Sequence, residues 1–303
     1  MISVADDWSD TWASQEIDVS LQQHSPLWIE SAWRDRDGVV FGWYHHEPEG
    51  VCASGGLTAP KIGALVSYDG GKTIKDLGIV LESGDPVDCS SMNGFFAGGH
   101  GDFSVILDRS RRYFYFFFTN YAGGLQSQGV ATARLAFEDR FRPAGSVYKY
   151  YAGKWEEPGI GGRVTPIFPA RQSWQREDTD SFWGPAVHWN TFLRQYVMLL
   201  NRSCCRSNWP QEGIYITYAK DLTVPPSWQA PRRIMDGAEA NGYYPQVVGQ
   251  GPGESDSLAG ETARLFVHGV SRWLISFLPG GAVGEDPIVD DSRIPTAPPV
   301  AGQ

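Results

Sequence analysis

The sequence has little basic charge, no long apolar run and few signs of helical periodicity. It carries 25 Lys and Arg against 35 Asp and Glu, a formal net charge of −10, so we expect no nucleic-acid partner. No apolar stretch is long enough for a membrane-spanning helix and no signal peptide is recognisable, so we expect no membrane partner. At 303 residues, the chain can bury the core of one large domain.

Two neighbouring stretches are typical of strands that are covered on both faces. Residues 102–107 are apolar and β-branched, and residues 113–119 are almost wholly aromatic. A strand without polar alternation is buried on both sides. The charged turn between the stretches joins them into a hairpin deep in a sheet structure, with Asp102 at its mouth.

The same hairpin pattern recurs along the chain. Copies lie at residues 26–44, at 183–200 and, more weakly, at 244–268. Another strand pair follows each of the hairpins at 26–44, 102–119 and 183–200. Four-stranded units that repeat at this spacing are the signature of a β-propeller. The sequence therefore predicts an all-β propeller whose innermost strands include residues 102–107, 185–189 and 245–248; an irregular β-sandwich is the alternative.

The two ends of the chain fit this repeat less well. Residues 1–25 are polar and show no opening hairpin, and a closed ring of only three to four blades would be tight. We therefore expect a five-bladed propeller domain over residues 1–280 that lacks part of its N-terminal blade, because Met1 is not the natural start. Residues 281–303 are rich in Pro and Asp and predict a disordered tail. A signal peptide upstream would make the protein secreted or periplasmic, and localisation otherwise stays unknown.

The four cysteines show no metal-type spacing. Cys52 and Cys89 lie in neighbouring loops and can form a disulfide in an oxidising compartment. The adjacent Cys204 and Cys205 can close only a strained eight-membered ring, and four reduced thiols are the alternative. A metal bound by the paired histidines at 45 and 46 with Glu47 is less favoured than plain polar loop residues. No cofactor is predicted, although a structural or central calcium ion stays open.

Propeller geometry predicts where a site would form. The starts of the innermost strands and the loops between second and third strands share one face of the ring. Carboxylates there supply acid and base chemistry, aromatic rings stack on sugars and amides bond to hydroxyls, so we expect a carbohydrate partner and a monomeric protein. The predicted catalytic residues are Asp102, Asp180 and Glu212, and the predicted substrate-binding residues are His100, Trp183, Tyr244, Gln246, His46, Glu47 and Asn120.

Several stretches resemble motifs of propeller glycoside hydrolases. Gly101-Asp-Phe-Ser-Val-Ile-Leu-Asp108 is similar to the Asp-Pro-Ser-Val strand start of the five-bladed families 43 and 32, and Trp183-Gly-Pro-Ala-Val-His188 resembles their Trp-Ala-Pro-Asp-Val-His strand start. Residues 213–222 resemble the strand and turn that close their blades. Ser67-Tyr-Asp-Gly-Gly-Lys-Thr-Ile74 is similar to the Asp box of sialidase-like propellers, which fixes a turn. The resemblance covers about residues 20–280.

This resemblance implies a base aspartate, a modulating aspartate and an acid glutamate at three innermost strand starts. Asp102 matches an aspartate position, but Ala186 stands where the family has its modulating carboxylate, so Asp180 is the substitute. Glu212 resembles the acid, although it lies at a third strand. Two functions stay open: a glycoside hydrolase acting on a neutral or cationic glycan by carboxylate acid/base chemistry, and a non-catalytic carbohydrate-binding or protein-interaction propeller. Two pocket acids about 5–10 Å apart would favour hydrolysis.

Overall fold

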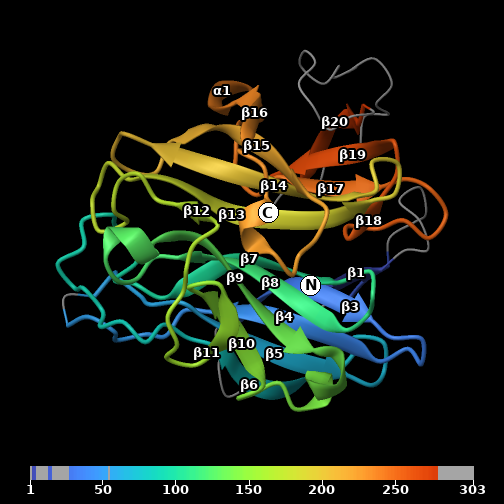
Figure 1. The fold of residues 1–303 in the computed structure, drawn as a ribbon, viewed down its shortest axis with the longest axis horizontal. Helices are drawn as coiled ribbons and strands as arrows, with labels where there is room; N and C mark the ends of the chain where they lie inside the picture. Colours follow the sequence, from blue (N-terminus) through green and yellow to red (C-terminus); the bar gives the residue numbers. More distant parts are fainter. Residues whose placement is uncertain (1, 5–12, 16–26, 54, 279–303) are drawn as a thin grey trace.

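The computed structural model of this chain is an all-β propeller (Figure 1). It describes residues 2–4, 13–15, 27–53 and 55–278. The predicted disordered tail at 281–303 lies outside the described residues, as does most of the stretch before residue 27. The sandwich alternative is wrong, because the sheets surround one cavity instead of forming two packed layers.

Four antiparallel sheets, here called blades 1 to 4, follow one another along the described chain. Blade 1 contains β3 (Leu27–Arg34), β4 (Val40–His46), β5 (Lys61–Ser67) and β6 (Lys75–Leu81). Blade 2 contains β7 (His100–Leu107), β8 (Tyr113–Asn120), β9 (Gly129–Ala136), β10 (Val147–Tyr151) and β11 (Lys154–Pro158), with β12 (Phe168–Pro169) paired to β9. Blade 3 contains β13 (Asp180–Asn190), β14 (Gln195–Cys204), β15 (Gln211–Ala219) and β16 (Arg232–Asp236), with β18 (Leu258–Ala259) parallel to β13. Blade 4 contains β17 (Gln246–Gly249), β19 (Thr262–Val267) and β20 (Val270–Ser276).

The remaining described elements are short. β1 (Ile2–Val4) pairs with β2 (Ala13–Gln15), and α1 (Gly237–Ala240) is a single turn. Three 3₁₀ helices lie at Leu125–Ser127, Phe137–Phe141 and Pro225–Ser227. Within the described part of the chain, none of the helices has the length and apolar character that a membrane crossing needs.

The innermost strands are β3, β7, β13 and β17, since residues of all four line the central cavity. The predicted innermost segments 102–107 and 185–189 lie in β7 and β13, and 245–248 overlaps β17, which confirms the propeller arrangement. The described residues form four blades. The predicted count of five is not confirmed and stays a prediction.

The aromatic strand β8 explains how blades 1, 2 and 3 hold together. Phe114, Phe116 and Phe118 pack with residues of blade 1, whereas Tyr115 and Phe117 pack with residues of blade 3. Successive side chains of a strand point to opposite faces, so one continuous apolar run serves two blade interfaces. Burying each such ring contributes about 1.5–3 kcal/mol relative to leaving it exposed.

Strand β14 repeats this arrangement one blade further on. Tyr196 and Met198 face blade 2, and Val197 and Leu199 join the cluster shared with blade 4. The face of blade 1 that points away from blade 2 lacks such a shared cluster. Among the described residues, the apolar cluster on this face consists of blade 1 side chains alone, and no cluster joins blade 1 to blade 4. The described interfaces thus run 1–2, 2–3 and 3–4.

A disulfide fixes the rim of the cavity beside blade 1. Cys52 and Cys89, whose Cα atoms are 5.6 Å apart, join the loop after β4 to the loop after β6. The same loops are connected by backbone hydrogen bonds from Thr58 N–H to the Phe95 carbonyl and from the Ala97 N–H to the Thr58 carbonyl. Together these bonds hold Phe95 and its neighbour Phe96 over the cavity.

The turn at residues 67–75 joins β5 to β6, as predicted for a turn between third and fourth strands. Asp69 accepts hydrogen bonds from the Thr73 N–H (2.9 Å) and the Thr73 hydroxyl (2.7 Å), and the Ser67 hydroxyl donates to it at 2.8 Å. Strand register pairs Val40 with Ser67 and His46 with Lys61, so the turn lies at the end of blade 1 away from His46. Its membership of the Asp-box class stays a prediction.

Candidate functional site

A cavity of about 640 Å³ lies between the four innermost strands, within the size range of small-molecule sites. Its lining combines carboxylates with aromatic rings and, among the described lining residues, includes no Lys or Arg. The acids are Glu30, Glu47, Asp102 and Asp256, and the aromatic residues, apart from the two histidines at 45 and 188, are Trp28, Phe95, Phe96, Phe103, Trp183, Trp209, Tyr243 and Tyr244.

Asp102 lies at an irregular point of β7, where the register with β8 shifts between Gly101 and Phe103. Its φ is +43°, a conformation that is uncommon for a residue with a side chain and is found more often at functional sites. The residue is buried, and its carboxylate accepts hydrogen bonds from the hydroxyls of Tyr121 and Tyr244, the latter at 2.9 Å. The bulge thus turns a buried carboxylate toward the cavity, where two phenols hold it.

Both phenols stay protonated over a wide pH range. Burial, followed by the negative charge of Asp102, raises the pKa of Tyr121 and of Tyr244 well above its usual value. Each hydroxyl therefore remains a hydrogen-bond donor to Asp102. No Arg or Lys lines the described cavity wall, so these two hydroxyls and the nearby His45 ring are the groups that compensate the carboxylate for lost water.

Glu30 is the second carboxylate of the site and was missed by the sequence analysis. It is the fourth residue of β3, and its Oε2 accepts a 2.8 Å hydrogen bond from the Phe103 N–H of the neighbouring blade. Its exposed surface faces the cavity, and the crowding of protein around it raises its pKa, an effect that His45 partly offsets. The sequence does contain a pattern that indicates Glu30: a lone carboxylate follows three apolar residues at the start of a strand, as a lone carboxylate marks Asp102.

Glu30 and Asp102 form a close carboxylate pair. One oxygen from each, together with a ring nitrogen of His45, all lie within 4.8 Å of one another. Two carboxyl groups at about 5 Å are the arrangement of retaining glycosidases, whereas inverting enzymes keep theirs about 6.5–9.5 Å apart.

His45 lies between two carboxylates near the end of β4. Its Nδ1 is 3.2 Å from Glu30 Oε1, and its Nε2 is 3.2 Å from Glu47 Oε1. Burial disfavours the charged ring, but the hydrogen bonds to Glu30 and Glu47, with the charges of Glu30 and Asp102, raise the pKa of His45 to about 10. Nδ1 also lies 3.3 Å from the Asp102 N–H, which donates to it when the ring is neutral, whereas the imidazolium form places its Nδ1–H against Glu30 Oε1.

Aromatic side chains form one wall of the cavity. Trp183 is buried, donates its indole N–H to Ser203 Oγ at 2.9 Å and lies edge-on to Tyr244 with 5.5 Å between ring centroids. Trp209 packs on Phe95 at 4.9 Å, and its own buried indole N–H has no acceptor in the described part of the chain. Trp28 and Phe95 are about half exposed at the rim. Such surfaces suit the apolar faces of sugar rings.

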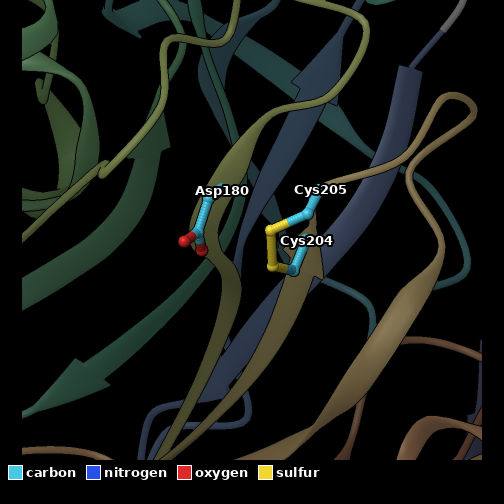
Figure 2. A group of neighbouring side chains, drawn as sticks. All are labelled: Asp180, Cys204 and Cys205. Carbon is cyan, nitrogen blue, oxygen red and sulfur yellow. A yellow bond between two sulfur atoms is a disulfide. The ribbon is translucent and has the colours of Figure 1, made fainter.

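Two groups of side chains bring metal-type donor atoms together. In the first, Glu30, His45 and Asp102, the donor atoms already have protein partners, and a metal would have to displace them. The second consists of Asp180 and the adjacent pair Cys204 and Cys205 (Figure 2), whose sulfurs are joined in a disulfide and so offer no thiolate. We therefore treat both groups as hydrogen-bonded clusters.

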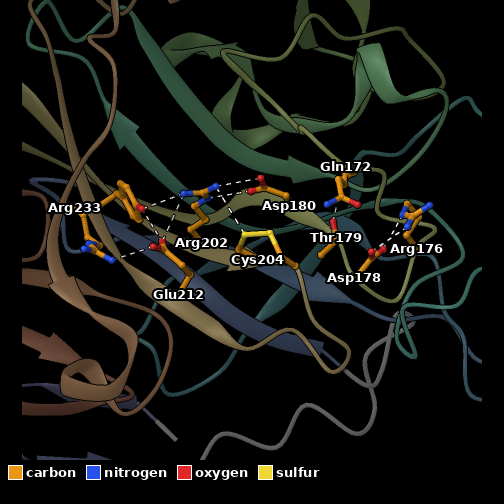
Figure 3. Close-up of a disulfide and its surroundings, with 11 residues drawn as sticks. Gln172, Arg176, Asp178, Thr179, Asp180, Arg202, Cys204, Glu212 and Arg233 are labelled. Carbon is orange, nitrogen blue, oxygen red and sulfur yellow. Dashed lines mark hydrogen bonds and ion pairs between the residues drawn. A yellow bond between two sulfur atoms is a disulfide. The ribbon is translucent and has the colours of Figure 1, made fainter.

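Asp180 and Glu212 are not among the residues that line the cavity. Figure 3 shows both carboxylates beside Arg202. Asp180 pairs with Arg202 at 3.0 Å, and Glu212 pairs with Arg233 at 3.1 Å and accepts a 2.6 Å hydrogen bond from Tyr215. This corrects the predicted convergence of three acids on one concavity. The reason is strand alternation: Asp180 and Phe182 share the face of β13 that meets Arg202, whereas the next residue, Trp183, lines the cavity.

The other predicted residues divide into two sets. Glu47, Trp183, Tyr244 and Gln246 line the cavity with Asp102, whereas His46, His100 and Asn120 do not. His100 is buried beside the Gly99 carbonyl, and burial followed by the nearby charge of Lys149 lowers its pKa well below the usual value. The Asn120 amide is bonded to the Ala122 and Ser127 carbonyls and fixes its own loop.

Comparisons with known proteins give likenesses of structure alone. No protein-family model matches the chain, and no curated protein matches it in sequence. Among solved structures it is similar to Zg3597, a family 117 glycoside hydrolase of the marine bacterium Zobellia galactanivorans (11% identity, TM-score 0.48, 85% of this chain and 66% of that one). It is also similar to an α-L-arabinanase of Cellvibrio cellulosa (14% identity, TM-score 0.47, 88% of this chain and 77% of that one). A thermostable family-43 glycoside hydrolase is similar as well (12% identity, TM-score 0.48, 92% of this chain and 85% of that one). The chain thus spans just under two thirds of Zg3597, and at these scores the activity must be argued from the site itself.

Proposed function

We propose that this propeller is a glycoside hydrolase that cleaves a neutral or cationic glycan in its central cavity. The observation that carries the proposal is the Glu30–Asp102 pair, within 4.8 Å, in a cavity walled by aromatic rings. The absence of Lys and Arg from the described lining disfavours anionic glycans, because the charged side chains that a carboxylate or sulfate would meet are four acids and an imidazolium that two of them already flank.

The two carboxyl groups take different roles because their surroundings differ. Burial raises the pKa of Glu30, which suits a general acid that protonates the leaving oxygen. Asp102 accepts hydrogen bonds from two phenols that hold its carboxylate in one orientation at the cavity, which suits a nucleophile or base. The short separation supports the retaining route, in which Asp102 attacks the anomeric carbon and Glu30 then activates water.

One observation favours a non-catalytic carbohydrate-binding protein instead. Both oxygens of Asp102 accept tyrosine hydroxyls, which occupies one lone pair on each oxygen and makes the carboxylate a weaker nucleophile. A site that only binds sugars would keep this network intact and use the aromatic wall for stacking. The two functions share the same ligand and differ in turnover.

The test is to measure hydrolysis and binding separately on one panel of neutral, amino and acidic oligosaccharides. We expect turnover of a neutral or amino glycan by the wild-type chain and its loss in Glu30→Gln and Asp102→Asn, with both variants still folded. Glu156→Gln, in an exposed carboxylate of β11, is the matched control and should keep full activity. Binding without turnover would refute the hydrolase and support a non-catalytic carbohydrate-binding protein. Neither binding nor turnover on any glycan of the panel would refute both functions.

A further inference from the structure

His45 is the most constrained polar side chain of the site, and the proposed reaction gives it no direct part. It is 4% exposed, lies on the second strand of blade 1 and reaches between two innermost strands. We propose that His45, held by Glu47, is a positioning residue that fixes the orientation and the protonation of Glu30. The inference rests on the proposed function only where it calls Glu30 the acid.

Two donors fix the Glu30 carboxyl group in place. The Phe103 N–H holds Oε2 at 2.8 Å, and His45 Nδ1 faces Oε1 at 3.2 Å. One donor per oxygen defines the plane of the carboxyl group, so the side chain presents a single arrangement to the cavity. Without His45, the hydrogen bond from the Phe103 N–H to Oε2 would remain and Oε1 would lose its contact with the ring nitrogen.

His45 is itself held on three sides. Glu47 lies against Nε2 at 3.2 Å, and Trp28 meets the ring edge-on at 6.0 Å between centroids. On the third side is Gly101, where a Cβ atom would lie 2.6 Å from His45 Cε1, closer than real contacts allow. Glycine at 101 is therefore what lets the bulge of β7 approach the ring, and it joins the placement of His45 to that of Asp102.

The charges around the ring all have one sign. Glu30 faces it from β3, Glu47 from the loop after β4 and Asp102 from β7, while the hydroxyls of Tyr121 and Tyr244 beyond them stay neutral. At Glu30, burial and the charge of Asp102 favour the protonated form, and the hydrogen bond and charge of His45 oppose them. Removing the imidazolium should thus make Glu30 a weaker acid.

The direct test is a carboxyl ¹³C NMR titration of Glu30 in the full chain without ligand. In His45→Gln, which keeps a hydrogen-bond donor but no charge, we expect the Glu30 midpoint to rise by about one to three pH units, the usual effect of losing an adjacent opposite charge. His46→Gln is the matched control: the neighbouring histidine on the same strand does not line the cavity, and its loss should leave the midpoint unchanged. An unchanged midpoint in a folded His45→Gln protein would overturn the proposal.

A second variant leaves every titrating group in place. Gly101→Ala puts a methyl group against His45 Cε1 and should displace the ring, so a smaller rise of the Glu30 midpoint is expected. If His45→Gln fails to fold, the Glu30 midpoint is measured in Gly101→Ala and in Glu47→Gln instead. Glu47→Gln removes the carboxylate that contacts His45 Nε2. An unchanged midpoint in both would then refute the proposal.

These titrations need no substrate, so they stand whether or not the chain hydrolyses a glycan. If it does, the basic limb of the kcat/KM profile in His45→Gln should move to higher pH by the same amount as the Glu30 midpoint. A purely structural role would lower the height of that profile and leave its limbs in place.

Discussion

Two clusters of acids in this propeller, one in the cavity and one in blade 3, are bonded in different ways. In the cavity, Glu30 and Asp102 receive a backbone N–H, an imidazole and two phenols. In blade 3, Asp180 and Glu212 are both bonded to Arg202. A guanidinium is cationic at all ordinary pH and gives its carboxylates charge-assisted hydrogen bonds, whereas the phenols donate as neutral groups and an imidazole can gain or lose a proton. The comparison agrees with the proposal that the first cluster serves chemistry, and it assigns the second cluster a role in stability.

The largest expected effect separates the two clusters by activity. Asp102→Asn and Glu30→Gln should each reduce turnover about 10²–10⁴-fold in a folded protein, the usual contribution of a positioned acid or base. Glu212→Gln should leave turnover within the experimental scatter, because its carboxylate lies outside the cavity. Steady-state kinetics on a substrate found in the glycan panel provides the measurement. A turnover loss in Glu212→Gln as large as in Asp102→Asn would show that the blade 3 cluster also acts in catalysis and would contradict this prediction.

Removing the shared arginine should reverse the pattern. Arg202→Met leaves Asp180 and Glu212 without their common partner and should lower the free energy of unfolding by about 2 kcal/mol, less than for a fully buried pair because part of the side chain is in solvent. Ligand affinity should not change. Urea unfolding with calorimetric binding checks both, and a stable Arg202→Met protein that no longer binds ligand would contradict the structural role.

The clusters should also differ in how stability depends on pH. The pKa of His45 is raised from 6.5 to about 10 in the folded chain, so its stabilising contribution is complete below pH 6.5 and is lost as the pH rises through about 10. The difference in unfolding free energy between wild type and His45→Gln should therefore shrink from pH 6 to pH 10. The difference between wild type and Arg202→Met should stay constant over the same range, and a parallel decline there would argue against the comparison.

The smallest expected effect lies at the far end of blade 1. Hydrogen bonds from Thr73 and Ser67 lower the pKa of Asp69 to about 2, so its contribution is present above pH 3.8 and is lost as the pH falls through about 2. Asp69→Ala should lower the melting temperature slightly at pH 7 and leave ligand binding intact. Weaker binding with an unchanged melting temperature would place this turn at the functional face.

The sequence by itself determined the strands and their burial. The aromatic run of β8 predicted a strand covered on both faces, and the structure shows its alternate residues in two blade interfaces. The lone carboxylate of Asp102 near the start of an apolar strand indicated a position at the cavity, and Asp102 lines the cavity in the structure. Both inferences depend on period-2 alternation and on the cost of burying a charge, which are local properties of a short segment.

Only the tertiary structure decided which acids meet. Glu30 and Asp102 are 72 positions apart and lie on different blades, and they become neighbours because β3 and β7 both border the cavity. The register shift at Gly101–Phe103 sets the direction of Asp102, and the alternation of β13 turns Asp180 toward Arg202. A single displaced residue in a strand reverses the face of a side chain, so strand order and bulge position, which follow from packing between blades, decide the composition of the site.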